Sequence, residues 1–216
     1  MLDKTDVTEI LARQVVATRW DAIPPPVRHQ AKRSLINFFA VTFAGCRSRP
    51  IEIALGLLGQ FSGAPQASVI GRSERLDAPS TAFINAACAN VDDFCDTHIA
   101  TVIHPTAPVA AALLAFAELR PVSGIDLLLA LVLGHEAQAR IGLAISPSHY
   151  DRGWHITSTC GAFGAAAGSG KLASLSERQM VWALGIAATQ SGGLCECLGT
   201  PAKSVSVGNA ARKSGR

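Results

Sequence analysis

Acidic, hydroxyl and imidazole side chains gather between residues 92 and 98 of this chain, within an alanine-rich surrounding. If the segment before them is a helix, Asp93, Asp96 and Thr97 stand at i, i+3 and i+4 and share one face near its C-terminal end. Carboxylates at that end oppose the helix dipole, so helix stability does not explain their presence. Either the acids cap the next turn or they belong to a site that moves protons.

Two histidines stand directly ahead of segments with helical character. His104 precedes a helix predicted over residues 107–119, and His155 precedes one predicted over residues 157–172. A helix N-terminus carries positive potential, which lowers a histidine pKa and suits both acid–base chemistry and the binding of anions. A packed structural histidine is the alternative for His155, but two such histidines and an acid cluster together favour a site for an anionic ligand.

Lys203 lies in a turn-rich passage, residues 199–208, that leads into a helix expected to open at Val207. A rigid lysine there can hold a carboxylate as a point charge, whereas the ordinary alternative is a solvated surface lysine. The chain reaches Arg216 before that helix could bury anything, so the sequence looks like the front part of a longer protein.

Several motifs that suggest other chemistry are incomplete. Residues 168–171 end in Gly-Lys, but a phosphate loop needs a first glycine at Ala165 and a hydroxyl residue at Leu172. His135 is followed by a glutamate, yet the second histidine of a zinc protease would fall on Ala139. The six cysteines show no CxxC pair and no zinc-finger spacing, so we expect reduced thiols and no metal site.

The composition is that of a globular protein with a large apolar core. Of the 216 residues, 49% are hydrophobic and only 16% are charged, and the formal net charge is +3. Lysines and arginines are scattered without a basic stripe, which argues against nucleic-acid binding. No run reaches the roughly 18 apolar residues of a membrane span, and the first residues lack the pattern of a secretory signal. We therefore expect a cytoplasmic protein with no membrane-spanning segment.

Apolar residues recur at helical spacing almost throughout the chain, which predicts an all-α fold. Only residues 67–71 look extended. Asp77, and Ser174 together with Glu177, show the pattern of helix caps. The glycine- and alanine-rich residues 161–168 predict a central, buried helix, because small side chains let neighbouring helices approach closely. Helices are predicted over residues 7–20, 26–44, 51–61, 79–94, 107–119, 124–146, 157–172 and 177–190.

Four groups of residues, taken in order, resemble the MmgE/PrpD family, whose members include 2-methylcitrate dehydratase, cis-aconitate decarboxylase and an iminodisuccinate epimerase. They are DFCDTH (93–98) with HP (104–105), GHEAQARIG (134–142), GWHITS (153–158) with GAFGAAA (161–167), and KS (203–204) with VGNAA (207–211). The resemblance implies that residues 1–216 form an incomplete N-terminal all-helical domain, without the later helices and the α/β lid domain. It also implies a homodimer that uses neither a metal nor an organic cofactor.

The resemblance assigns catalytic roles to Asp93, His104, His155 and Lys203, and substrate contacts to Thr97 and Lys203. Family reactions form or quench a carbanion-like centre beside a carboxylate, which requires a base, an acid and a cation. The implied activity is that of a lyase on a small di- or tricarboxylic acid, of the 2-methylcitrate dehydratase type. Decarboxylation and epimerisation are close alternatives, and a silent helical module for binding or oligomerisation is the alternative of a different class.

Two positions depart from the family pattern. Cys95 stands where an aspartate is common, and Ser206 stands where many members carry a histidine. Both lie near expected site residues, so they leave the substrate open. We expect the four catalytic side chains to meet in one polar pocket between helices, and residues 1–216 alone to be helical yet inactive.

Overall fold

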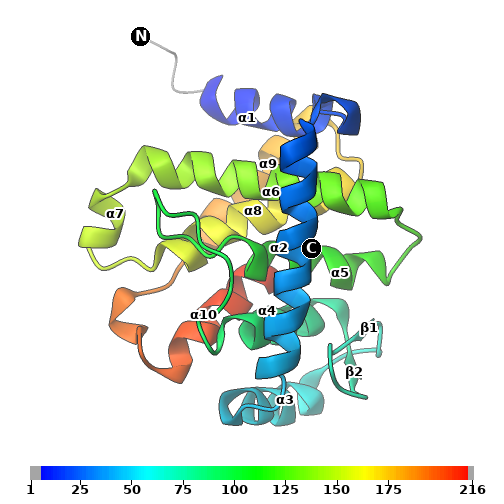
Figure 1. Cartoon of the computed structure of the whole chain (residues 1–216), viewed down its shortest axis with the longest axis vertical. Coiled ribbons are helices and arrows are strands. Elements are labelled where there is room, and N and C mark those ends of the chain that lie inside the picture. Colours follow the sequence, from blue (N-terminus) through cyan, green and yellow to red (C-terminus); the bar gives the residue numbers. More distant parts are fainter. Residues whose placement is uncertain (1–5, 214–216) are drawn as a thin grey trace.

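Helices make up most of residues 6–213, the part of the chain that the structure, a computed structural model, describes (Figure 1). The predicted all-α fold is therefore confirmed. Two short 3₁₀ helices, Trp20–Ala22 and Cys195–Cys197, lie between longer elements. The α-helices are α1 (Asp6–Ala17), α2 (Pro25–Gly45), α3 (Arg49–Phe61), α4 (Ala78–Asn90), α5 (Thr106–Ala117), α6 (Gly124–Ile145), α7 (Ser148–Asp151), α8 (Ile156–Leu172), α9 (Glu177–Gln190) and α10 (Pro201–Arg212).

The extended segment predicted at residues 67–71 is one strand of a small hairpin. β1 (Ala67–Ser68) pairs in antiparallel fashion with β2 (Arg75–Leu76), and Ser68 stands opposite Arg75. The hairpin packs on α4 and α5, so it extends the helical body without forming a second layer.

The glycine- and alanine-rich helix α8 is central, as predicted. It packs against α5, α6, α9 and α10, and 15 of its 17 residues are buried. The closest approach is to α6, where a Cβ added to Gly134 would lie 2.7 Å from the carbonyl oxygen of Gly164. A Cβ on Gly164 would in turn lie 2.9 Å from the carbonyl oxygen of Gly134, so a larger residue at either position would push the two helices apart.

By length and composition, α6 is apolar enough to cross a membrane, which the sequence analysis did not anticipate. In the folded chain, however, it lies along α8 and buries Leu129, Leu131 and Leu133 among other residues. Part of the apolar surface of α6 is therefore covered by the other described helices.

The end of α4 differs from the prediction. The helix stops at Asn90 instead of continuing to residue 94, and Asp93 has a φ of 59°, in the left-handed region. Aspartate tolerates this conformation better than most residues, because its short side chain bonds locally. Asp93, Asp96 and Thr97 therefore lie on a loop, and the shared helical face predicted for them is wrong.

The position of Lys203 also differs, since it lies inside α10 and not in a turn before a helix. The Thr200 side chain accepts a hydrogen bond from a backbone N–H of the first turn at 3.2 Å, and Pro201 is the first residue of the helix. A Cβ on Gly208 would lie 2.7 Å from the carbonyl oxygen of Phe83 in α4. The last helix is thus tightly packed, and the expectation that it buries nothing is wrong.

Helix caps are confirmed in one place and corrected in another. Asp77 caps α4 by accepting a backbone hydrogen bond at 2.9 Å, as predicted. The capping box of α9 consists of Ser176 and Gln179, and the pair Ser174 and Glu177 was wrong by two residues. The same Ser-x-x-Glu/Gln spacing occurs in both pairs, so spacing alone does not choose between them.

Candidate active site

The loop from residue 91 to residue 105 carries the first part of the site from α4 to α5. Asp93 lies in its left-handed turn, and further on the backbone N–H of His98 donates to the carbonyl of Ile103 at 2.8 Å, which folds the loop back on itself. The backbone N–H of His104 then donates to Oγ1 of Thr157 at 3.1 Å. The start of α5 is thereby fixed against the start of α8.

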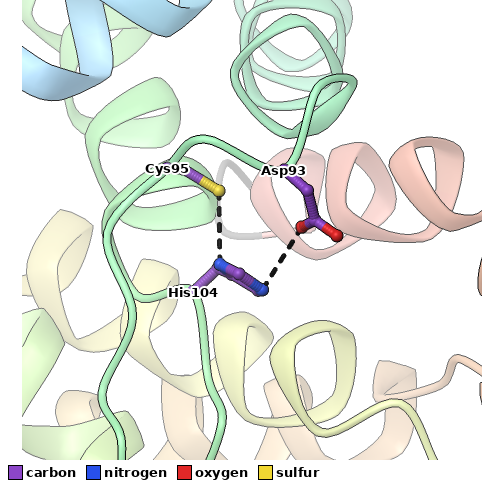
Figure 2. Close-up of side chains that lie close together, drawn as sticks. All are labelled: Asp93, Cys95 and His104. Carbon is purple, nitrogen blue, oxygen red and sulfur yellow. Dashed lines mark hydrogen bonds and ion pairs between the residues drawn. The ribbon is translucent and has the colours of Figure 1, made fainter.

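Asp93, His104 and Lys203 form a contact group that we call the Asp93 cluster. Lys203 donates a hydrogen bond to Oδ1 of Asp93, and the same oxygen lies 3.4 Å from Nε2 of His104, toward which the carboxylate points in Figure 2. The lysine side chain is only 10% exposed, whereas that of Asp93 is 58% exposed. A buried cation thus meets an acid that solvent reaches.

Asp93 stays ionised in this setting. Burial alone would raise its pKa, but the hydrogen bond and the charge of Lys203 outweigh burial, and the pKa of Asp93 falls below its usual range. The carboxylate therefore holds the Lys203 ammonium in place until another anion competes for it.

His104 is oriented by the groups around its second ring nitrogen. Nδ1 lies 3.2 Å from the carbonyl oxygen of Asp96, 3.3 Å from Oγ1 of Thr97 and 3.4 Å from Sγ of Cys95. A carbonyl oxygen only accepts, so Nδ1 carries a proton in the contact with Asp96. Nε2 faces the Asp93 carboxylate, which is an acceptor, so this contact is attractive only when Nε2 carries a proton.

Cys95, the first departure from the family pattern, is a buried neutral thiol. Burial raises its pKa to about 11, and Nδ2 of Asn90 donates to its sulfur at 3.4 Å. Ligand-type atoms of Asp93, Cys95 and His104 lie within 4.8 Å of one another, a spacing that a metal ion could bridge (Figure 2). The ring, however, turns Nδ1 to the thiol and Nε2 to the carboxylate, so neither nitrogen faces both. Metal-free chemistry remains our prediction.

His155 occupies the N-cap position of α8 and is buried. Its Nδ1 lies 2.8 Å from Oγ of Ser158 and 3.2 Å from Oγ of Ser206, which stands one helical turn after Lys203 on α10. Burial first, and then the positive charge of Lys203, lower the pKa of His155 to about 4. This imidazole is therefore neutral near neutral pH, as expected for a histidine placed at a helix N-terminus.

The structure thus brings the four predicted catalytic residues to the junction of the α4–α5 loop, α8 and α10. Three of them touch within the Asp93 cluster, and His155 is tied to the same helix as Lys203 through Ser206. Thr97 lies beside His104 with an exposed side chain, where a bound substrate could reach it. Their roles in a reaction stay predictions.

A second acid–histidine group lies close by, consisting of Asp96, Thr106 and His135, which we call the Asp96 cluster. Oδ1 of Asp96 accepts the backbone N–H of Thr106 at 3.2 Å, and Oδ2 accepts its hydroxyl at 2.5 Å. The Thr106 hydroxyl in turn lies 3.1 Å from Nε2 of His135. The alternative that an acid of this loop caps the next helix is therefore correct for Asp96.

Sequence reasoning missed the two serines that contact His155, naming Ser206 only as a departure from a family pattern. A signal was present, because Ser158 follows His155 by three positions and Ser206 follows Lys203 by three, the spacing of neighbours on a helix. Thr157, which receives the His104 backbone N–H, carried no such signal. The phosphate-loop-like Lys171 is structural, since it donates to backbone carbonyls at the end of α1.

A separate cavity of about 480 Å³ lies between α4, α5, α8, α9 and α10. Its lining is largely apolar, with Ala112, Phe116 and Ile186 among its residues, and includes none of the four candidate catalytic residues.

Residues 9–215 match the family model of the MmgE/PrpD N-terminal domain. The cis-aconitate decarboxylase of Aspergillus terreus is 32% identical over 216 residues, which cover 97% of this chain and 44% of the relative. The cis-aconitate decarboxylase-like protein oryM of Aspergillus oryzae is 33% identical over 197 residues, which cover 88% of this chain and 41% of the relative. The human cis-aconitate decarboxylase is 30% identical over 213 residues, which cover 95% of this chain and 44% of the relative. This chain spans less than half the length of these relatives.

Proposed function

Because the chain belongs to the MmgE/PrpD family, we propose that it works as a carboxylic-acid lyase on a small tricarboxylate, with decarboxylation of cis-aconitate as the first candidate reaction. One observation carries the proposal: the buried Lys203 ammonium and the His104 imidazole meet at one solvent-exposed acid, Asp93. The names of the relatives supply the candidate substrate.

Substrate binding begins at the cation. A carboxylate of the substrate approaches the Lys203 ammonium from the exposed side of Asp93 and competes with that side chain for it. The positive end of α8 lies at the same junction and favours a second negative group. A substrate with several carboxylates therefore fits this site better than a neutral one.

In the decarboxylation, the bond between carbon and the departing carboxylate breaks, and CO₂ leaves. The electron pair remains on the substrate as an enolate-like centre, spread into a neighbouring carboxylate that the Lys203 charge stabilises. His104 then gives its Nε2 proton to the carbon, which completes the balance of one proton taken up for each CO₂ released.

Dehydration of 2-methylcitrate is the second candidate, because the site holds a base as well as an acid. His155 is neutral and can take a proton from carbon, while His104 can give one to a departing hydroxyl. The C–H electron pair becomes the new double bond, the C–O bond breaks, and the hydroxyl leaves as water. Decarboxylation needs only the acid, His104, and not the base, His155.

The test is a direct assay of the purified full-length protein on both acids. We expect CO₂ release from cis-aconitate, or else water loss from 2-methylcitrate, and no loss of either activity after treatment with EDTA. Zn²⁺ or Mn²⁺ restoring an activity that EDTA had abolished would contradict metal-free proton transfer. A folded helical protein that converts neither acid would overturn the proposal.

A further inference from the structure

The ring of His155 ends a chain of four polar groups that joins α8 to α10. Nδ1 lies 2.8 Å from Oγ of Ser158, which lies 2.7 Å from Oγ of Ser206. The Ser206 hydroxyl lies 2.7 Å from the backbone carbonyl oxygen of Lys203. Nδ1 is also 3.2 Å from Oγ of Ser206, a longer second contact.

The directions of these hydrogen bonds follow from counting protons. A carbonyl oxygen can only accept, so the hydroxyl proton of Ser206 is committed to Lys203. The contact between the two hydroxyls then requires the proton of Ser158. With both hydroxyl protons in use, the contact between Ser158 and His155 needs a proton on Nδ1.

We infer that Ser158 and Ser206 are positioning residues that hold His155 as its Nδ1–H tautomer and leave Nε2 as the proton acceptor of the site. Within residues 6–213, no hydrogen bond engages Nε2, so its lone pair has no partner in the described part of the chain. The tautomer follows from the hydrogen bonds alone, whereas its use in catalysis rests on the proposed function.

The surroundings keep this arrangement rigid. The backbone N–H of His155 donates to the carbonyl of Gly193 at 3.0 Å, and a Cβ on Gly193 would lie 2.6 Å from Cβ of Ser158. Gly193 also has a φ of 138°, which side-chain-bearing residues rarely adopt. Ser158 is thus held between a close backbone and the imidazole, and its hydroxyl has little freedom to turn elsewhere.

The inferred tautomer fits a proton acceptor opposite His104. The two imidazoles differ, because Nε2 of His104 faces the Asp93 carboxylate, whereas Nε2 of His155 has no hydrogen-bond partner within residues 6–213. A bare nitrogen repels a carboxylate and attracts a C–H or O–H group. The substrate therefore turns a proton-bearing atom, and not a carboxylate, toward Nε2 of His155, while one carboxylate lies at Lys203.

Nitrogen-15 NMR of labelled histidine side chains at about pH 7 measures the tautomer directly. We expect the wild-type His155 signal to show Nδ1–H, with the signal identified by its loss in His155→Asn. In Ser206→Ala, the Ser158 hydroxyl becomes free to donate to Nδ1, and the ratio of tautomers should shift toward Nε2–H by about tenfold, the worth of one hydrogen bond.

Three further variants test whether the tautomer ratio of His155 depends on the Ser206 hydroxyl in particular. Ser158→Ala should keep Nδ1–H, because Nδ1 can still donate to the Ser206 oxygen. Ser206→Thr retains a hydroxyl and should restore the wild-type ratio. Ser204→Ala, which changes a buried serine on the same helix without a contact to His155, should leave the ratio unaltered.

A wild-type signal with the proton on Nε2, or an unchanged ratio in Ser206→Ala, would overturn the inference. Circular dichroism shows whether each variant is folded. If Ser206→Ala does not fold, Ser206→Thr still tests the inference. Turnover measured in parallel tests the proposed function separately. A protein that converts no acid but shows Nδ1–H would refute the function and leave the positioning role standing.

Discussion

The Asp93 cluster and the Asp96 cluster contain the same residue types, a carboxylate and an imidazole, and begin three positions apart on one loop. Both oxygens of Asp96 accept hydrogen bonds from Thr106, a residue that is only 1% exposed, so this acid is engaged in holding the start of α5. Asp93 is 58% exposed and holds a cation that another anion could claim.

The comparison teaches that residue type and spacing do not separate a structural acid from a chemical one. The two acids are separated instead by how many of their hydrogen-bonding sites are occupied and by how far solvent reaches them. The Asp96 cluster fixes the start of α5, and through it the place of His104, whereas the Asp93 cluster holds a charged pair that solvent reaches.

The largest difference should appear in turnover. Lys203→Met removes the charge that stabilises the developing anion, and we expect turnover to fall by about 100-fold or more, the scale for losing such a group. Lys32→Met, which changes an exposed lysine on α2, is the matched control and should keep near-normal turnover. Steady-state kinetics on the better of the two acids measures both. Equal turnover in the two variants would show that Lys203 does not contribute to the reaction.

The second difference should appear in stability. Asp96→Ala leaves the buried N–H and hydroxyl of Thr106 without their acceptor, and we expect the free energy of unfolding to fall by about 1–3 kcal/mol. Asp92→Ala, in the same loop but exposed, should change it by no more than about 0.5 kcal/mol. Urea unfolding followed by circular dichroism gives both values. A large loss of turnover in Asp96→Ala with unchanged stability would mean that the two acids have exchanged roles.

The smallest difference should appear in the pH dependence of stability. Burial lowers the pKa of His135 below its ordinary value of 6.5, so the unfolded chain binds more protons than the folded one below that pH. The stability that neutral His135 contributes is therefore complete above about pH 6.5 and is lost as the pH falls. Asp93, with a pKa lowered from 3.8, keeps its charge in this range, and its contribution is lost only at lower pH.

Unfolding experiments from about pH 7 to about pH 5 test this point. His155 acts in the same direction, because its pKa is also lowered, so the comparison is between the wild type and His135→Gln. As the pH falls, we expect the free energy of unfolding to decrease less steeply in His135→Gln than in the wild type. Identical slopes would show that burial does not lower the pKa of His135.

The sequence was sufficient to predict the helical fold and to place His104 and His155 just ahead of helices. Continuous helical periodicity predicted most helices within a few residues, and the proline after His104 and the small residues after His155 marked the helix starts behind them. These signals are local, because each depends on neighbours within one or two turns of the chain.

The rest of the site depends on contacts between distant segments, which local patterns do not encode. The end of α4 at Asn90 and the left-handed turn at Asp93 accompany an ion pair with a residue 110 positions later. The role of Ser206 likewise exists only because α10 lies against α8. The start of α10 is different, since Thr200 and Pro201 form a recognisable cap signature that the sequence interpretation overlooked.

The separation of 110 positions between Asp93 and Lys203 also affects when the site forms during synthesis. At about 5–20 residues per second, α10 leaves the ribosome roughly 5–20 s after the loop that carries Asp93. Over that interval the earlier helices can assemble, but the acid has no cation and the face of α4 that α10 later covers remains open. The nascent chain therefore cannot pair Asp93 with Lys203 before α10 has docked on α4.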